Sequence, residues 1–258
     1  MEIASIVVKV GTSTLTHATG LINLRRVELL SRVLCDLKNE GIKVVLVSSG
    51  AIGVGVSKLG LSDRPTEMPV KQAVAAVGQV ELMNIYTRMF ADYGVATAQI
   101  LLTKDVVTDV TLKENAVNTL STLLSLGVVP IVNENDVIST YEIEFGDNDT
   151  LSAHVARLVR ADLLVILSDI DGLYDSDPNK NSNAKLISRV ERITDEIRVL
   201  AKGSSSKVGT GGMITKLNAA EIAAESGIDT VIINGREPSL LYDLLEGKDI
   251  GTYFSKAF

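Results

Sequence analysis

Cysteine is almost absent from this chain: Cys35 is the only one among 258 residues. A single cysteine excludes an internal disulfide framework and a cysteine metal cluster, and it suits a reducing compartment. Cys35 falls on the periodic apolar positions of a predicted helix over residues 23–40. We therefore expect a small buried side chain there rather than a nucleophile.

Long apolar runs are missing as well. No stretch approaches the roughly 18 consecutive apolar residues that a membrane span needs. The chain also enters a strand pattern directly, with no charged and apolar leader before it. We expect a cytoplasmic protein that has no membrane partner.

Positive charge is in deficit, and histidine is scarce. The chain has 25 lysines and arginines, 32 acidic residues and two histidines, which gives a formal charge of −7. Such a field repels nucleic acid, so we expect no nucleic-acid partner, and anionic substrates must be attracted locally. His17 lies in a predicted loop and His154 in a predicted helix, and we expect neither to act as a base.

The common nucleotide and calcium motifs are absent too. No GxxxxGK[ST] occurs, and the glycines of residues 48–55 give GxxGxG rather than the dinucleotide pattern GxGxxG. The acidic run over 168–178 has the wrong glycine position and no terminal glutamate for a calcium loop. We therefore assign no residue as a metal ligand.

What the chain does have is a regular alternation of apolar strands and amphipathic helices. Strands are predicted at 3–10, 44–47, 95–102, 128–132, 162–167, 186–190, 230–233 and 251–254, and helices at 23–40, 70–93, 111–126, 149–159, 195–200, 217–226 and 240–245. Strand, helix and strand at this spacing imply parallel crossovers and an α/β fold. The long helix over 70–93 is a plausible subunit interface.

The most informative stretch begins the helix at Asp149. Short polar residues there run into an apolar periodic segment, which is typical of a helix N-terminus. A carboxylate at that position would repel a phosphate unless it orients cations that contact the phosphate. Lys9 ends the first strand, and Lys216 closes a glycine-rich run over 209–216. We hypothesise that Asp149 holds both ammonium groups over a transferring phosphoryl group; a simple helix cap is the alternative.

Three further segments could line the same site. The glycine-rich run before Lys216 could cradle phosphate oxygens with its backbone amides. The turn over 48–55 could let backbone amides approach an anion, with Ser49 adding a hydroxyl, or it could be only a tight turn. The polar cluster over 133–136 follows a buried strand, where an α/β sheet meets its ligand crevice.

Six ordered blocks resemble the amino acid kinase family, and most closely its members that phosphorylate glutamate. They are VVKVGTS (7–13), VSSGAIGVG (47–55), PIVNEND (130–136), FGDNDTLSA (145–153), SDIDGLYDSDP (168–178) and GTGGMITK (209–216). The resemblance implies a three-layer α-β-α sandwich with a central, mostly parallel sheet. It also implies one domain over 1–258, with an amino-acid-binding half at about 1–160 and an ATP-binding half at about 161–258. Many members carry a C-terminal PUA domain, and we expect this chain, which ends at Phe258, to lack it.

The resemblance also assigns residues to the two substrates. Those assigned to ATP are Lys9, Ser168, Asp169, Thr210, Gly211, Gly212, Met213, Ile214, Thr215 and Lys216. Those assigned to glutamate are Ser49, Gly50, Asn135, Asp136 and Asn148. Asp136 suits the α-ammonium group of glutamate, and Ser49, Asn135 and Asn148 suit its carboxylates. Lys9, Asp149 and Lys216 are the expected catalytic residues.

The implied reaction moves the γ-phosphoryl group of ATP to the side-chain carboxylate of L-glutamate. This carboxyl group has an ordinary pKa near 4.3 and is already ionised at neutral pH, so no general base is needed. Mg²⁺ is expected with ATP, bound mainly by phosphate oxygens. The resemblance further implies proline biosynthesis. Because glutamyl phosphate is a reactive acyl phosphate, we expect hand-over of the product to a glutamyl phosphate reductase. We also expect a homo-oligomer, with the helix over 70–93 as a plausible interface.

Two other kinds of function stay open from the sequence. One is a family member acting on N-acetylglutamate, aspartate, carbamate or UMP. An acylated substrate has no ammonium group and would leave Asp136 without its counterpart, which favours the free amino acid. The other is a non-catalytic module that senses a nucleotide or amino acid, which would not need a charge-neutralising pair of lysines.

Overall fold

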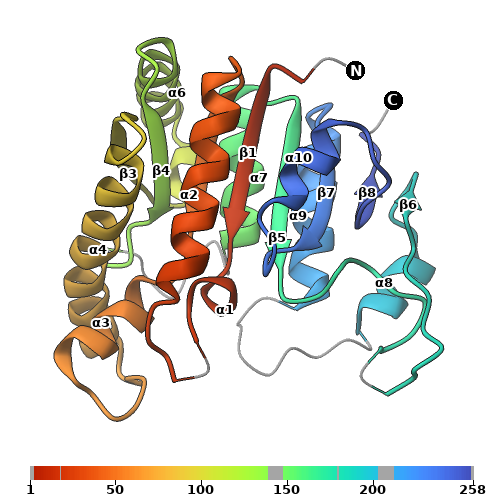
Figure 1. Cartoon of the computed structure of the whole chain (residues 1–258), viewed down its shortest axis with the longest axis horizontal. Coiled ribbons are helices and arrows are strands. Elements are labelled where there is room, and N and C mark those ends of the chain that lie inside the picture. The colour runs from red at the N-terminus through yellow and green to blue at the C-terminus, as the bar shows by residue number, and fades with distance from the viewer. Residues whose placement is uncertain (1–2, 18, 139–147, 179, 203–211, 257–258) are drawn as a thin grey trace.

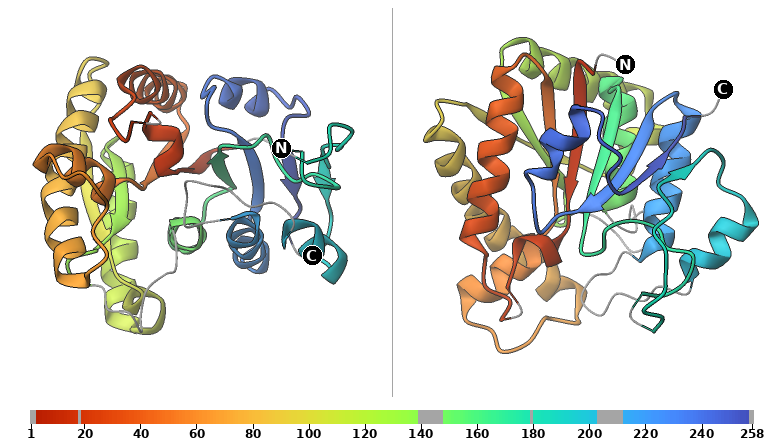
Figure 2. Two further views of the ribbon diagram at one scale, coloured as in Figure 1. Left: turned by 90° about the horizontal axis from the view of Figure 1, so that it is seen from below. Right: turned by 45° about the vertical axis from the view of Figure 1, so that its right-hand side comes forward.

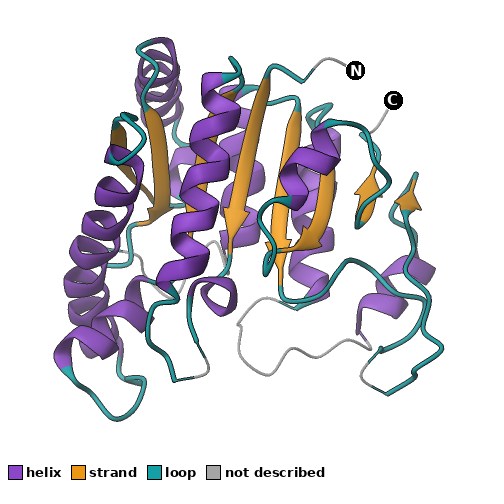
Figure 3. Cartoon of the chain, viewed as in Figure 1, coloured by secondary structure: helices purple, strands orange, loops and turns teal. Residues whose placement is uncertain are grey.

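Buried apolar strands alternate with helices along the chain, as the sequence pattern predicts (Figure 3). The computed structural model describes residues 3–17, 19–138, 148–178, 180–202 and 212–256. The strands are β1 (Ser5–Val10), β2 (Lys43–Ser48), β3 (Thr97–Leu102), β4 (Val129–Glu134), β5 (Leu163–Ser168), β6 (Arg189–Val190), β7 (Asp229–Asn234) and β8 (Thr252–Phe254). The helices are α1 (Thr12–Leu15), α2 (Leu24–Asn39), α3 (Ala51–Leu59), α4 (Met68–Ala91), α5 (Asp105–Thr108), α6 (Val110–Ser125), α7 (Asn148–Val159), α8 (Asp195–Lys202), α9 (Met213–Glu225) and α10 (Leu240–Leu245).

The strands form one sheet in the order β3-β4-β2-β1-β5-β7-β8-β6. The pairs from β3 to β7 are parallel, and β8 joins β7 in the antiparallel direction. Parallel strands need helical crossovers, which cover both faces of the sheet. The carboxyl ends of β1, β2, β4 and β5 therefore lie along the same end of the sheet, the lower end in Figure 1.

Helices cover the sheet in two layers, so the predicted three-layer sandwich is confirmed. Figure 2 (left) shows α2, α4 and α10 over one face and α6, α7 and α9 over the other. Each helical layer packs against its own face of the sheet and forms a separate apolar core. Strand β1 contributes side chains to both cores. Ile6, Val8 and Val10 pack into the core under α2 and α4, whereas Val7 belongs to the core under α7 and α9. Successive side chains of a strand point to opposite faces.

Two glycines allow α3 and α4 to pack closely. A Cβ atom added at Gly55 would lie 2.0 Å from the carbonyl oxygen of Val74, and one at Gly78 would lie 1.8 Å from that of Ala51. Gly50 starts α3 in the left-handed conformation, with φ 107°. Backbone conformation therefore explains the glycine at position 50, and close helix packing explains the glycine at position 55. Only the first residues of the 48–55 segment lie at the end of the sheet where β2 ends.

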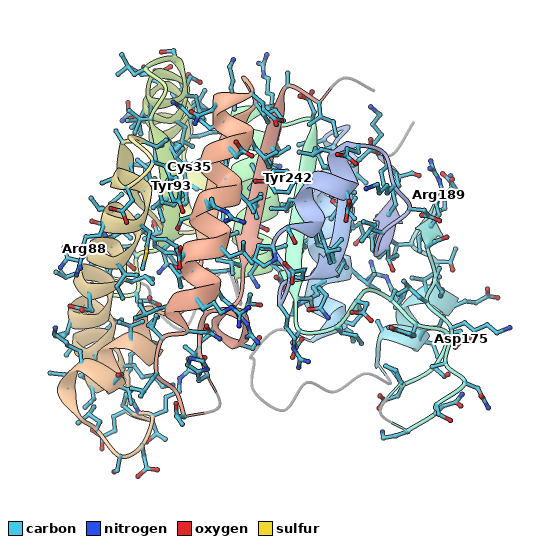
Figure 4. All side chains as sticks on the ribbon, in the orientation of Figure 1. Cys35, Arg88, Tyr93, Asp175, Arg189 and Tyr242 are labelled. Carbon is cyan, nitrogen blue, oxygen red and sulfur yellow. The ribbon has the colours of Figure 1, made fainter. Side chains whose placement is uncertain are left out.

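Some local expectations need correction. Residues 12–15, for which the sequence pattern predicted no helix, form the short helix α1. The strand expected at 128–132 continues to Glu134 because Asn133 and Glu134 pair with Leu101 and Leu102 of β3. The strand expected at 186–190 is reduced to β6. Cys35 is buried on α2 among apolar side chains, which confirms its expected packing role (Figure 4).

Candidate active site

Three charged side chains converge where β1 ends. The Nζ atom of Lys9 lies 2.6 Å from Oδ1 of Asp149, and Nζ of Lys216 lies 3.0 Å from Oδ2 of the same carboxylate. Asp149 is completely buried, and only 7% of Lys9 and 6% of Lys216 is exposed. Charged residues are almost never this deeply buried unless they are paired. The structure therefore brings together the three residues that we predicted to be catalytic.

Local structure explains this convergence. Lys9 follows Val7 by two residues on β1, so its side chain points to the face that α7 and α9 cover. Asp149 is the second residue of α7, and Lys216 is the fourth of α9. Both helices therefore begin near the carboxyl end of β1. Asp149 lies inside the helix and contacts both lysines, which is the arrangement that we hypothesised rather than a simple helix cap.

The pKa of Asp149 reflects the balance of these groups. Burial on its own would raise the pKa, but the ammonium groups of Lys9 and Lys216 outweigh it. The hydroxyl of Thr215 also donates to Oδ2 at 2.8 Å. The pKa falls from 3.8 to about 2, so Asp149 is ionised at neutral pH. One negative charge between two positive charges leaves a net positive site, which favours a polyanion.

An amide cluster lies beside this triangle, at the ends of β2 and β4. The Nδ2 atom of Asn148 lies 2.9 Å from each of three oxygens, which are the carbonyl of Ser48, Oγ of Ser49 and Oδ1 of Asn133. A carbonyl oxygen only accepts hydrogen bonds, so this contact fixes which end of the Asn148 amide faces inward. Because its donor end is occupied by these oxygens, Asn148 offers an acceptor, Oδ1. This differs from the expectation that it serves carboxylates.

Asn133 belongs to this cluster, and it lies in the polar segment 133–136 that was predicted to line the site, but it was not among the residues assigned to a substrate. It is buried, and it shares the α4 face of β4 with Val129 and Ile131. Extending the period-two pattern of β4 two residues further would have indicated it. Of the two neighbours that we chose instead, Asn135 donates its backbone N–H to Leu102. Both Asn135 and Asp136 are half-buried just beyond the strand.

The other predicted positions lie at the same end of the sheet or outside the described residues. Ser168 is buried at the end of β5, and its hydroxyl donates to the exposed Asp169. Gly212 caps α9, and Met213, Ile214 and Thr215 form its first turn. Thr210 and Gly211 lie outside the described residues.

His154 is half-buried on α7. It lies in the second turn of α7. Burial, together with the nearby charges of Arg157 and Lys104, lowers its pKa from 6.5 to about 4. The imidazole is therefore neutral at pH 7.

Comparison with known proteins assigns the chain to a family. The sequence pattern of the amino acid kinase family matches residues 4–234. The chain belongs to the amino acid kinase family. The resemblance carried by the six sequence blocks is thereby confirmed.

Relatives within the amino acid kinase family match nearly the whole chain. A protein named glutamate 5-kinase from Clostridium perfringens is 56% identical over 253 residues, which cover 96% of this chain and 94% of that protein. A glutamate 5-kinase from Listeria welshimeri is 53% identical, covering 97% of this chain and 92% of that protein.

Solved structures share the fold at low sequence identity. The UMP kinase from Ureaplasma parvum superimposes with a TM-score of 0.67 at 15% identity, covering 99% of this chain and all of that one. An isopentenyl phosphate kinase superimposes with a TM-score of 0.66 at 16% identity, covering 97% of this chain and all of that one. These likenesses concern the fold alone.

Two features are absent from the residues that the structure describes. None of the helices in those ranges is long and apolar enough to cross a membrane. Within the same ranges, no group of three or more histidine, cysteine or acidic side chains is placed to hold a metal ion.

Proposed function

We propose that this chain transfers the γ-phosphoryl group of ATP to the side-chain carboxylate of L-glutamate, giving glutamyl 5-phosphate and ADP. The observation that carries the proposal is the buried triangle of Lys9, Asp149 and Lys216. The names of relatives more than 50% identical over nearly the whole chain support glutamate as the acceptor and proline biosynthesis as the pathway.

The chemistry requires two anions to meet. The glutamate carboxylate is ionised at neutral pH and attacks the γ-phosphorus directly, so no base has to remove a proton. Lys9 and Lys216 would contact the phosphoryl oxygens and offset the repulsion between the two substrates. Asp149 would hold the two ammonium groups in place before the substrates arrive, so that little reorganisation is needed during transfer.

The nucleotide is proposed to bind across the C-terminal half of the chain, from about residue 161 to 258. Ser168 and Asp169 end β5, and the first turn of α9 carries Met213 to Lys216. A helix N-terminus presents free backbone amides and a positive dipole end to phosphate. Lys9 would reach the same phosphates from β1.

Mg²⁺ is proposed to arrive with the nucleotide. The two ammonium groups and single carboxylate at the centre form a phosphate-binding set rather than a metal-binding one. They fit an ion held by phosphate oxygens and water, as Mg²⁺ usually is. When bound, Mg²⁺ would supply positive charge that offsets part of the negative charge of the phosphates.

The amino acid is proposed to bind in the N-terminal half, from about residue 1 to 160. Oγ of Ser49 accepts from Asn148, so its own proton can be donated to a substrate carboxylate. The Oδ1 atom of Asn148 and the carboxylate of Asp136 are acceptors that suit the α-ammonium group. Gly50 would let the backbone approach the ligand.

An acceptor panel tests the proposal. L-glutamate, N-acetylglutamate, L-aspartate and UMP are each supplied with MgATP, and ADP release is followed in a coupled assay. Hydroxylamine traps an acyl phosphate as a hydroxamate, so L-glutamate should give equal amounts of ADP and hydroxamate. ADP release that does not depend on glutamate, or that is greater with another acceptor, would contradict the assignment. Binding of glutamate and ATP with no ADP release would indicate a sensing module.

Three further proposals concern the cellular setting. An acyl phosphate hydrolyses readily, which favours direct hand-over to a glutamyl phosphate reductase. The exposed apolar side chains of α4, Val77 and Val80 among them, favour burial in a homo-oligomer. A single cysteine and an acidic surface favour a cytoplasmic location.

A further inference from the structure

Gln79 is a buried polar residue on the apolar face of α4. It shares that face with Ala75, Leu82 and Tyr86, all of which are buried. A glutamine in such a position is usually held by a specific partner, because an unpaired buried amide is costly. Its Oε1 atom accepts a hydrogen bond of 2.9 Å from Nδ2 of Asn133.

The contact completes the set of partners around the Asn133 amide. Oδ1 of Asn133 accepts from the backbone N–H of Glu134 and from Nδ2 of Asn148, both at 2.9 Å. Because the N–H of Glu134 can only donate, Oδ1 must face it, and Nδ2 must therefore point to α4. Gln79 provides the acceptor at that end.

The same logic extends to Asn148. Its Nδ2 faces the carbonyl of Ser48, Oγ of Ser49 and Oδ1 of Asn133. Oδ1 of Asn148 is then the atom of this amide that a ligand can use, and it is an acceptor. Of the three functional groups of glutamate, the two carboxylates only accept at neutral pH, and the α-ammonium only donates.

We propose that Gln79 is a positioning residue that fixes Asn133, and through it presents Oδ1 of Asn148 to the α-ammonium group of the substrate. The inference rests on the proposed function and deepens it, since it explains how the site selects a free amino acid. Gln79 itself contacts no substrate. Without it, Nδ2 of Asn133 loses its acceptor, and the side chain turns away from Asn148 to find another.

The test uses Gln79→Met, which keeps the length of the side chain and removes the acceptor. KM for L-glutamate should rise roughly tenfold, while kcat and KM for ATP change by less than about twofold. Asn118→Met is the matched control, because it replaces an amide by methionine at an exposed position of α6, away from the α4 surface that is proposed to be a subunit interface. It should leave all three constants unchanged. Circular dichroism checks folding, and Gln79→Ala replaces Gln79→Met if the latter does not fold.

An inhibitor that lacks the α-ammonium group distinguishes a positioning role from a general disruption of the binding site. Glutarate is glutamate without its α-ammonium group, and its inhibition constant against glutamate can be measured in the same assay. Gln79→Met should change this constant by less than about twofold, because the affected hydrogen bond is absent from the glutarate complex. An equal loss for glutamate and glutarate, or a loss in kcat with KM unchanged, would overturn the inference while leaving the proposed reaction intact. Failure of the unaltered protein to release ADP with glutamate would instead contradict the proposed reaction.

Discussion

Asp149→Asn removes one charge from the centre of the site and almost no volume. In the native protein the carboxylate contacts Lys9 at 2.6 Å, Lys216 at 3.0 Å and the Thr215 hydroxyl at 2.8 Å. The amide cannot balance two ammonium groups, and its Nδ2 end would face one of them with hydrogens. The substitution therefore tests whether the carboxylate holds the lysines together.

The effect on stability follows from the pKa of Asp149. Its fall from 3.8 to about 2 means that ionised Asp149 stabilises the folded state by on the order of 2 kcal/mol at pH 7. Removing one partner of a buried ion pair typically costs about 3–5 kcal/mol. We expect the free energy of unfolding, measured in urea at pH 7, to fall by about 2–4 kcal/mol. Because the folded pKa is lowered, this contribution is complete above pH 3.8 and disappears as the pH falls towards 2.

The effect on catalysis should appear in turnover. Misplaced ammonium groups no longer meet the transferring phosphoryl group, so kcat should fall by about a hundredfold. KM for glutamate should change by less than about threefold, because Asp149 is not proposed to contact glutamate. ADP release titrated with glutamate measures both constants. Glu246→Gln is the control, since it breaks an exposed pair with Lys248 and should change neither stability nor turnover appreciably. A rise in KM with kcat unaltered would refute the proposed role of Asp149.

The other predictions concern the lysines and the packing of α3 on α4. Lys9→Ala and Lys216→Ala should each lower kcat by at least about tenfold with an unchanged circular dichroism spectrum; near-normal turnover in both variants would exclude the paired-lysine mechanism. Gly78→Ala should lower the free energy of unfolding by about 3 kcal/mol, because the added methyl group overlaps the carbonyl of Ala51. Gly53→Ala in α3, where the nearest atom lies at 3.6 Å, should be neutral or slightly stabilising in the same urea titration.

The fold was largely predictable because its signals are local. Alternating strand and helix periods gave most elements to within a few residues, and Lys9 stood out as a charge inside a β-branched run. The antiparallel direction of β8 was not predictable, because the period-two pattern of a short strand is the same in either direction. The helix α1 was too short to show a helical period.

The site was predictable where a charge interrupts an apolar pattern, and less so where neutral amides carry it. Asn133 was included in the polar segment 133–136 but was not assigned to a substrate, because the polar run gives no sign of where β4 ends. That end is set by pairing with β3, a contact distant in sequence. The direction of the Asn148 amide was beyond the sequence as well, since it depends on the carbonyl of Ser48 and on a neighbouring strand.

The charged triangle draws its members from widely separated parts of the chain. Lys9 lies near the beginning of the chain, and Asp149 and Lys216 are 67 residues apart. During synthesis on the ribosome, Lys216 emerges well after the other two, so a nascent chain that stops before α9 cannot assemble the pair of cations. In the proposed mechanism, phosphoryl transfer therefore becomes possible only late in translation, and a shortened product of the same message would be catalytically inactive.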